Sequence, residues 1–200
     1  MKVQPTDYLG ALLPLPARVL GNRLLPFTLG HRLILERLGN PFVTSGPVEI
    51  PDLLTGIIVC TRAPDDAWRA LDSWRALWHA RTLGWRSRLS GADYLSTCAA
   101  FRAYVEDGSR LPSFWQKDNR KRLAVPLTLL VKVYLQKELG YSHDEAMNRP
   151  WGAALHEYCV ALSIAGQLDL IDADEAEFVN NIEPLNEEEI AALRKAANGV

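Results

Sequence analysis

The segment LAVPLTLLVKVYLQKELG, from Leu123 to Gly140, decides the fold of this chain. At helical spacing its polar residues form one narrow stripe: Thr128, Lys132 and Gln136. The rest of the circumference is apolar up to the last turn, as in a helix enclosed by other elements. Pro126 suits a first helical turn, and Gly140 suits the C-terminal stop. The valines would also suit a buried strand, but the length and the polar ending favour a helix. We therefore expect a central helix at about 126–139.

Capping residues and amphipathic patterns predict further helices on both sides of this segment. Thr28 caps one helix, and Ser142 with Glu145 forms a capping box for another. Two short apolar runs around Gly21-Asn22 predict a small N-terminal β-hairpin with a type II′ turn. The expected helices cover 29–38, 53–62, 64–83, 90–108, a short stretch after Ser142, 151–165 and acidic segments within 168–200. The fold class is all-α, with seven to nine helices around the central one.

Length and composition indicate a single helical domain over residues 1–200. Within it we distinguish a Pro-rich N-terminal segment at 1–27, a basic exposed linker at 108–122 and acidic C-terminal helices at 168–200. No apolar run reaches the roughly 18 residues that a membrane span needs, so no membrane partner is expected. Three scattered cysteines fit buried thiols in a reducing compartment, which predicts a cytoplasmic location.

The charge is divided unevenly along the chain. Residues 1–140 hold 19 Lys and Arg against 12 Asp and Glu, a formal charge of +7, whereas residues 141–200 hold 3 against 12, a formal charge of −9. The division is compatible with a basic surface for an acidic partner, but mutual attraction of the two parts is the favoured interpretation.

The usual signatures of catalysis, phosphate binding and metal binding are missing from the sequence. His156 and Cys159 would touch on a helix, as a thiolate nucleophile and its base would. Their apolar neighbours favour instead a core thiol beside a half-buried histidine. His31 and His143 are likewise interpreted as structural. We therefore expect no catalytic residue, no cofactor, no metal site and no enzyme activity.

Aromatic and basic residues supply the candidate partner-binding site. Its members are Phe114, Trp115, Lys117, Arg120, Lys121, Arg122 and Trp85. Cations with adjacent aromatic rings suit nucleic acid, but one basic cluster in a chain of pI ≈ 6.1 makes that partner the less favoured one. An exposed tryptophan would instead mark a protein-binding groove. Trp68, Trp74 and Trp78 recur at helical spacing and are expected in the core.

Two segments of the sequence resemble a family of helical phage proteins. One is LLPFTLGHRLILERLGNPF, Leu24 to Phe42, followed by IIVCTR, Ile57 to Arg62; the other is GYSHDEAMNRPWGAALHEY, Gly140 to Tyr158. They are similar to parts of the tail assembly chaperone-like proteins of tailed phages. The resemblance implies a non-enzymatic chaperone that binds a helical partner, such as the tape-measure protein, during virion morphogenesis. It also implies a host-cytoplasmic location.

Two other functions remain open at this point. The chain would also suit a structural component of a phage particle, either a connector or a tail protein, and a homo-oligomer is compatible with the sequence. A helical nucleic-acid binder using the 114–122 segment is the remaining alternative. An exposed apolar groove would favour the chaperone, whereas a continuous basic face would favour the nucleic-acid binder.

Overall fold

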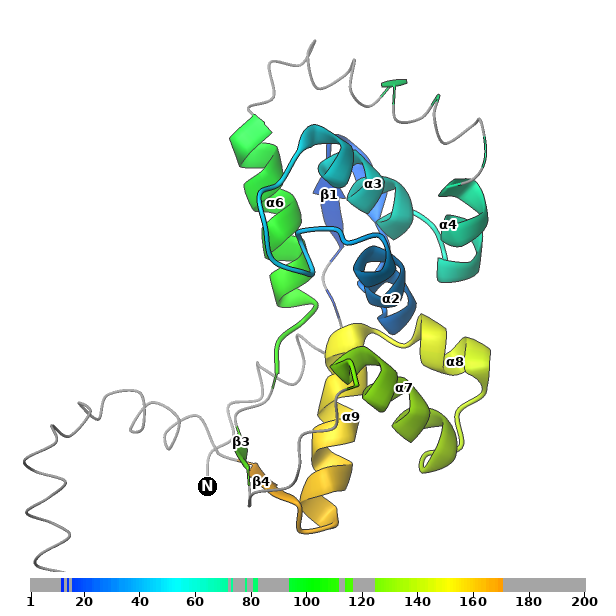
Figure 1. Ribbon diagram of the computed structural model, residues 1–200, viewed down its shortest axis with the longest axis vertical. Coiled ribbons are helices and arrows are strands. Elements are labelled where there is room, and N and C mark those ends of the chain that lie inside the picture. The colour runs from blue at the N-terminus through cyan, green and yellow to red at the C-terminus, as the bar shows by residue number, and fades with distance from the viewer. Residues whose placement is uncertain are drawn as a thin grey trace, which may run out of the picture.

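The computed structural model describes residues 12, 14, 16–71, 73, 78, 81–82, 94–111, 114–116 and 125–170. Within these ranges seven helices and two antiparallel strand pairs are present, so the all-α fold class with a small hairpin is confirmed. Figure 1 shows two groups of elements, one above the other. The first holds β1 (Ala17–Val19), β2 (Asn22–Leu24), α2 (Leu29–Arg37), α3 (Ile50–Cys60), α4 (Pro64–Leu71) and α6 (Tyr94–Asp107). The second holds β3 (Phe114–Gln116), α7 (Leu127–Lys137), α8 (His143–Asn148), α9 (Trp151–Ile164) and β4 (Leu168–Leu170).

The N-terminal hairpin forms, but its turn lies one residue earlier than expected. Val19 pairs with Asn22, which makes Leu20-Gly21 the turn in place of Gly21-Asn22. Both turn residues have positive φ, +48° and +74°, and this combination defines a type I′ turn. The Asn22 side-chain amide donates to the Leu20 carbonyl at 3.0 Å, which holds the turn in this register.

Helix α2 lies at the centre of the molecule and packs against α3, α4, α7, α8 and α9. Its cap is reciprocal: the His31 N–H donates to the Thr28 hydroxyl at 3.3 Å, and the Thr28 N–H donates to His31 Nδ1 at 3.2 Å. Gly30 permits the close approach of its neighbours, since an added Cβ would lie 2.6 Å from the Pro64 side chain and 2.9 Å from the Met147 carbonyl oxygen. The central position therefore belongs to α2.

Helix α7 forms where the sequence predicts a helix, but it is not enclosed. Only Thr128, Val131 and Leu135 are buried along it. Leu127, Leu129 and Val133 are 44%, 43% and 41% exposed. The expectation of a central, surrounded helix at 126–139 is therefore wrong in this respect, because apolar composition specifies how much surface a helix could bury and not what neighbours it meets.

Two backbone hydrogen bonds join the upper group of elements to the lower one. The Leu29 N–H donates to the Arg149 carbonyl at 3.0 Å, and the Trp151 N–H donates to the Phe27 carbonyl at 2.7 Å. Trp151 is buried at this junction, with the Arg32 guanidinium 5.1 Å from the centre of its ring. The start of α9 is thus fixed against the start of α2.

The second strand pair joins segments that are distant in sequence. Phe114 of β3 pairs with Leu170 of β4, in antiparallel register. Residues 168–170 are therefore a strand, which corrects the helical expectation at the start of 168–200; residues 171–200 lie outside the described ranges. Likewise 114–116 is paired backbone within the expected linker at 108–122. Strands of three residues whose pairing partners are more than 50 positions away cannot be recognised from the neighbouring sequence.

The described ranges contain no helix that is long and apolar enough to cross a membrane. They also correct the expected environment of two tryptophans. Trp68 is 41% exposed and Trp78 is 59% exposed, so neither is a core residue. Trp74 lies outside the described ranges. The expectation was based on helical spacing beyond Leu71, where α4 ends.

Candidate protein-binding site

Helix α7 presents an apolar face to solvent, and this face is the candidate site. We call it the α7 apolar face and define it as Leu129 and Val133. Leu129 and Val133 are one turn apart and lie on the side of the helix opposite the buried Val131 and Leu135. The helix is thus apolar on both sides, but only one side has a partner within the described residues.

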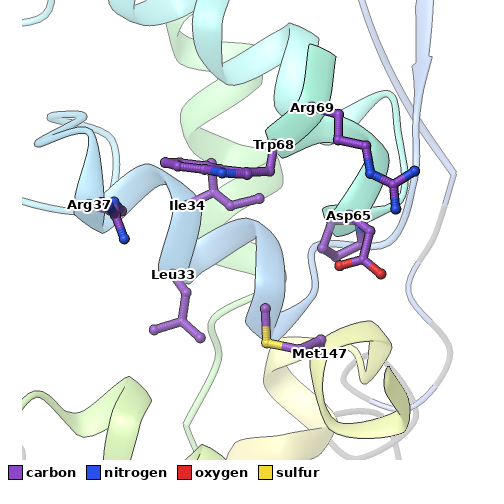
Figure 2. Close-up of a pocket in the computed structure, with 8 residues that line it drawn as sticks. Leu33, Ile34, Arg37, Asp65, Trp68, Arg69 and Met147 are labelled. Carbon is purple, nitrogen blue, oxygen red and sulfur yellow. The ribbon is translucent and has the colours of Figure 1, made fainter. Parts of the chain in front are cut away.

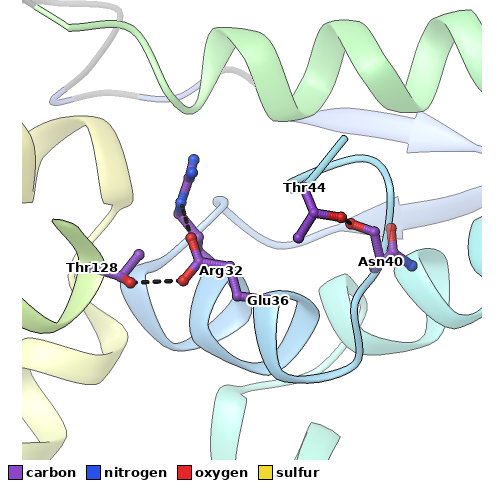
Figure 3. Close-up of polar contacts among 5 residues, drawn as sticks. All are labelled: Arg32, Glu36, Asn40, Thr44 and Thr128. Atoms are coloured by element: carbon purple, nitrogen blue, oxygen red, sulfur yellow. Dashed lines mark hydrogen bonds and ion pairs between the residues drawn. The ribbon is translucent and has the colours of Figure 1, made fainter. Parts of the chain in front are cut away.

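A hydrogen bond between Glu36 and the buried Thr128 favours the rotation of α7 that exposes Leu129 and Val133. The Thr128 hydroxyl, which is 1% exposed, donates to Glu36 Oε2 at 2.6 Å, while Glu36 Oε1 accepts from Arg32 Nε at 2.9 Å (Figure 3). Thr128, the first residue of the polar stripe Thr128, Lys132 and Gln136, is therefore buried. A buried hydroxyl without a hydrogen bond would cost free energy, so this contact favours the orientation in which Leu129 and Val133 point away from α2.

Apolar packing on the same buried side of the helix holds this orientation as well. Val131 and Leu135 are fully buried in the core shared with α2 and α9. The Tyr134 ring meets the Tyr158 ring of α9 edge to face, with ring centres 5.2 Å apart. These contacts fix the rotation of α7 about its axis, so the exposed apolar residues occupy defined positions.

Two lysines flank the α7 apolar face. At helical spacing, Lys132 lies on one side of the Leu129–Val133 pair and Lys137 on the other. Lys137 is exposed and Lys132 is half-buried, and neither forms an ion pair within the described part of the chain. The face therefore combines apolar contact area with a positively charged border, which suits an apolar surface bordered by carboxylates.

The structure tests little of the candidate site that the sequence predicts. Phe114 and Trp115 lie in β3, where their backbone pairs with β4. The remaining members lie outside the described ranges: Lys117, Arg120, Lys121, Arg122 and Trp85. Their role in partner binding stays a prediction.

The histidine and cysteine of α9 are both buried. His156 Nδ1 donates to the Gly152 carbonyl at 2.8 Å, and Cys159 is 3% exposed. Burial raises the pKa of the Cys159 thiol to about 11, which keeps the sulfur protonated near neutral pH. Burial likewise raises the pKa of Cys60 to about 12. A nucleophilic cysteine requires the opposite shift.

His31 is held neutral inside the protein. Its Nδ1 accepts from the Thr28 N–H, and its Nε2 lies 2.6 Å from the Arg62 carbonyl oxygen. A carbonyl oxygen can only accept, so Nε2 carries the proton and the ring is the neutral Nε2–H tautomer. Burial lowers the pKa of this histidine below its usual 6.5. Its role is to join the start of α2 to the end of α3.

Sequence reasoning missed the α7 apolar face because it assigned those residues to the core. The available signal was Thr128, a residue that can satisfy its hydroxyl inside a protein, at the start of the polar stripe. Within the described residues, no three His, Cys, Asp or Glu side chains gather where they could hold a metal ion. The surface chemistry found here is apolar contact bordered by positive charge.

Comparisons of the chain with protein-family models, with curated proteins and with solved structures gave no match. The functional argument therefore depends on the residues of this chain.

Proposed function

We propose that this chain is a non-enzymatic protein that binds an amphipathic helix of a partner protein over the α7 apolar face. The observation that carries the proposal is the orientation of α7, with Thr128 buried and Leu129 and Val133 exposed. Large apolar side chains that stand together on a protein surface commonly mark a site of protein–protein contact.

The spacing of the face favours a helix as the partner. Leu129 and Val133 are four residues apart, and this is the spacing with which one helix packs its side chains against another. Helix recognition of this kind uses apolar anchors at intervals of three and four residues. The partner would supply a complementary apolar stripe.

The flanking charges define the chemistry of the partner further. Lys132 and Lys137 border the apolar pair, so the partner helix would carry Asp or Glu beside its apolar stripe. Such rim charges steer association and set orientation more than they add affinity. The complex would therefore form more slowly at high salt.

The family resemblance supplies a narrower form of the proposal. In that form the chain is a tail assembly chaperone-like protein of a tailed phage, and its partner is the tape-measure protein during virion morphogenesis in the host cytoplasm. A structural role in the particle would use the same face for a lasting contact. A chaperone would release the partner before the particle is complete, whereas a structural component would stay bound to it.

Co-expression with the helical proteins encoded by neighbouring genes tests the proposal. We expect one of them to be recovered with the chain and to bind it directly in isothermal titration calorimetry. Leu129→Gln combined with Val133→Gln should weaken this binding at least about tenfold, which corresponds to roughly 1.4 kcal/mol. Leu95→Gln on α6 is the matched control, because Leu95 is a 71% exposed apolar residue on another helix.

Three results would contradict the proposal. One is failure to recover any helical protein. Another is equal binding by the double variant and the parent chain. The third is recovery of DNA, which would favour the nucleic-acid alternative.

A further inference from the structure

A surface pocket between α2, α4 and α8 lies outside the α7 apolar face. Its volume is about 300 Å³, and Figure 2 shows the side chains around it. Its lining includes Ile34, Arg37, Asp65, Trp68, Arg69 and Met147. The three helices are not consecutive in the chain, so only the tertiary fold brings them together around the pocket.

The apolar part of the pocket suits one large apolar side chain. Trp68 lies above Ile34 in Figure 2, and Met147 lies toward the opposite boundary. Trp68 is 41% exposed, so one part of its ring remains available for contact. Tryptophan together with arginine is the combination enriched at the energetically dominant positions of protein interfaces.

Arg37 lies over the ring of Trp68 and is itself exposed. The guanidinium carbon of Arg37 lies 4.9 Å from the centre of the Trp68 ring. A cation over the face of a ring is attracted by the ring electrons, and a guanidinium also carries N–H donors that can contact a carboxylate in pairs. An arginine held in this way is prepared for a bidentate contact with a carboxylate.

The charges around the pocket place that carboxylate at the Arg37 end. Arg69 lies near acidic groups of its own helix: Asp65 lines the same part of the pocket, and Asp66 Oδ1 is 3.9 Å from Arg69 Nη1. Arg37 forms no ion pair with any described residue. The Arg37 end is therefore the one with an unneutralised positive charge.

We propose that this pocket binds an acidic peptide segment of a protein partner, with one large apolar side chain against Trp68 and an adjacent carboxylate on Arg37. The volume of the pocket is at the small end of the range for small-molecule sites. Arg37 and Arg69 are exposed to solvent. Both features favour a single side chain of a peptide over a small molecule as the ligand. The proposal does not depend on the α7 apolar face.

Binding of short peptides to the full chain tests this proposal. The probe is an acetylated and amidated pentapeptide with one phenylalanine between two pairs of glutamates. We expect it to shift the indole N–H signal of Trp68 in a ¹H–¹⁵N correlation spectrum, with that signal assigned by Trp68→Phe. A peptide with alanine in place of phenylalanine, and one with lysines in place of glutamates, should leave the signal unchanged.

Variants of the arginine make the test specific. Arg37→Gln should weaken binding of the glutamate peptide at least about tenfold, and Arg37→Lys should weaken it nearly as much because lysine cannot make the two-point contact of a guanidinium with a carboxylate. Arg102→Gln is the matched control, since Arg102 lies over the Phe42 ring at 5.9 Å, outside the pocket. Leu129→Gln with Val133→Gln should leave peptide binding unchanged, which separates this site from the α7 apolar face.

Three outcomes would overturn the proposal. They are an unchanged Trp68 signal, equal binding by the Arg37→Gln variant, and equal binding of hexanoate, which would make the pocket a site for small hydrophobic carboxylates.

Discussion

Helices α2 and α7 show that apolar composition and burial are separate properties. Helix α7 has the more continuous apolar sequence, yet Thr128, Val131 and Leu135 are its only buried residues. Helix α2 contains a histidine, two arginines and a glutamate, yet it buries five residues: Leu29, Gly30, His31, Ile34 and Leu35. The difference arises because α2 has neighbours on several sides, whereas one side of α7 has none among the described residues.

The largest expected effect is on α2. Leu35 is fully buried, so Leu35→Ala should lower the free energy of unfolding by about 2–5 kcal/mol through lost burial and the cavity it leaves. Urea denaturation followed by circular dichroism measures this loss. A loss below about 1 kcal/mol would contradict the central position of α2.

The contact between the two helices should have the next largest effect. Thr128→Val removes the hydroxyl that donates to Glu36, and the free energy of unfolding should fall by about 1–2 kcal/mol. The control is Thr44→Val: the Thr44 hydroxyl donates to the Asn40 carbonyl at 3.0 Å but is on an exposed residue (Figure 3). Equal losses for the two variants in urea denaturation would show that the buried contact contributes nothing specific.

The free energy of unfolding should depend on pH through His31, a buried histidine of α2. The pKa of His31 is lowered by burial in the folded state, so the unfolded chain binds the extra proton as pH falls below 6.5. Stability should therefore fall with decreasing pH by up to about 1.4 kcal/mol per pH unit. Urea denaturation between pH 6.5 and 5.5, compared with His31→Gln, measures this term, and an identical pH dependence in the variant would exclude it.

The smallest expected effect is on the α7 apolar face. Leu129→Gln and Val133→Gln should each change the free energy of unfolding by less than about 0.5 kcal/mol, because both side chains are already exposed. The same urea assay applies. Losses comparable to that of Leu35→Ala would mean that this face is covered within the chain.

Local signals in the sequence predicted the parts of the fold that depend on neighbouring residues. Both Thr28 and Ser142 form the caps expected of them, because a cap involves only the first turn of its own helix. The position of the hairpin turn was missed because Leu20 has a positive φ, which a leucine seldom adopts, so residue preferences gave no signal for a turn at Leu20-Gly21.

Contacts between distant residues were beyond the same reasoning. The orientation of α7 depends on Thr128 and Glu36, which are 92 positions apart. The pocket depends equally on Arg37 and Trp68, which come from different helices. Of the candidate site that the sequence predicted, only the backbone of Phe114 and Trp115 lies within the described ranges. Spacing along one helix carries no information about either kind of contact.

The pairing of β3 with β4 has a consequence for how this protein can be rearranged. Phe114 and Leu170 lie opposite each other, so the segment that contains α7, α8 and α9 begins and ends at the same place. A segment whose two ends are adjacent can be inserted into a loop of another protein, because the insertion does not force the two ends of that loop apart. A graft of this segment would carry α7 together with α9, whereas the contacts with Glu36 and α2 that orient α7 would have to come from the recipient protein.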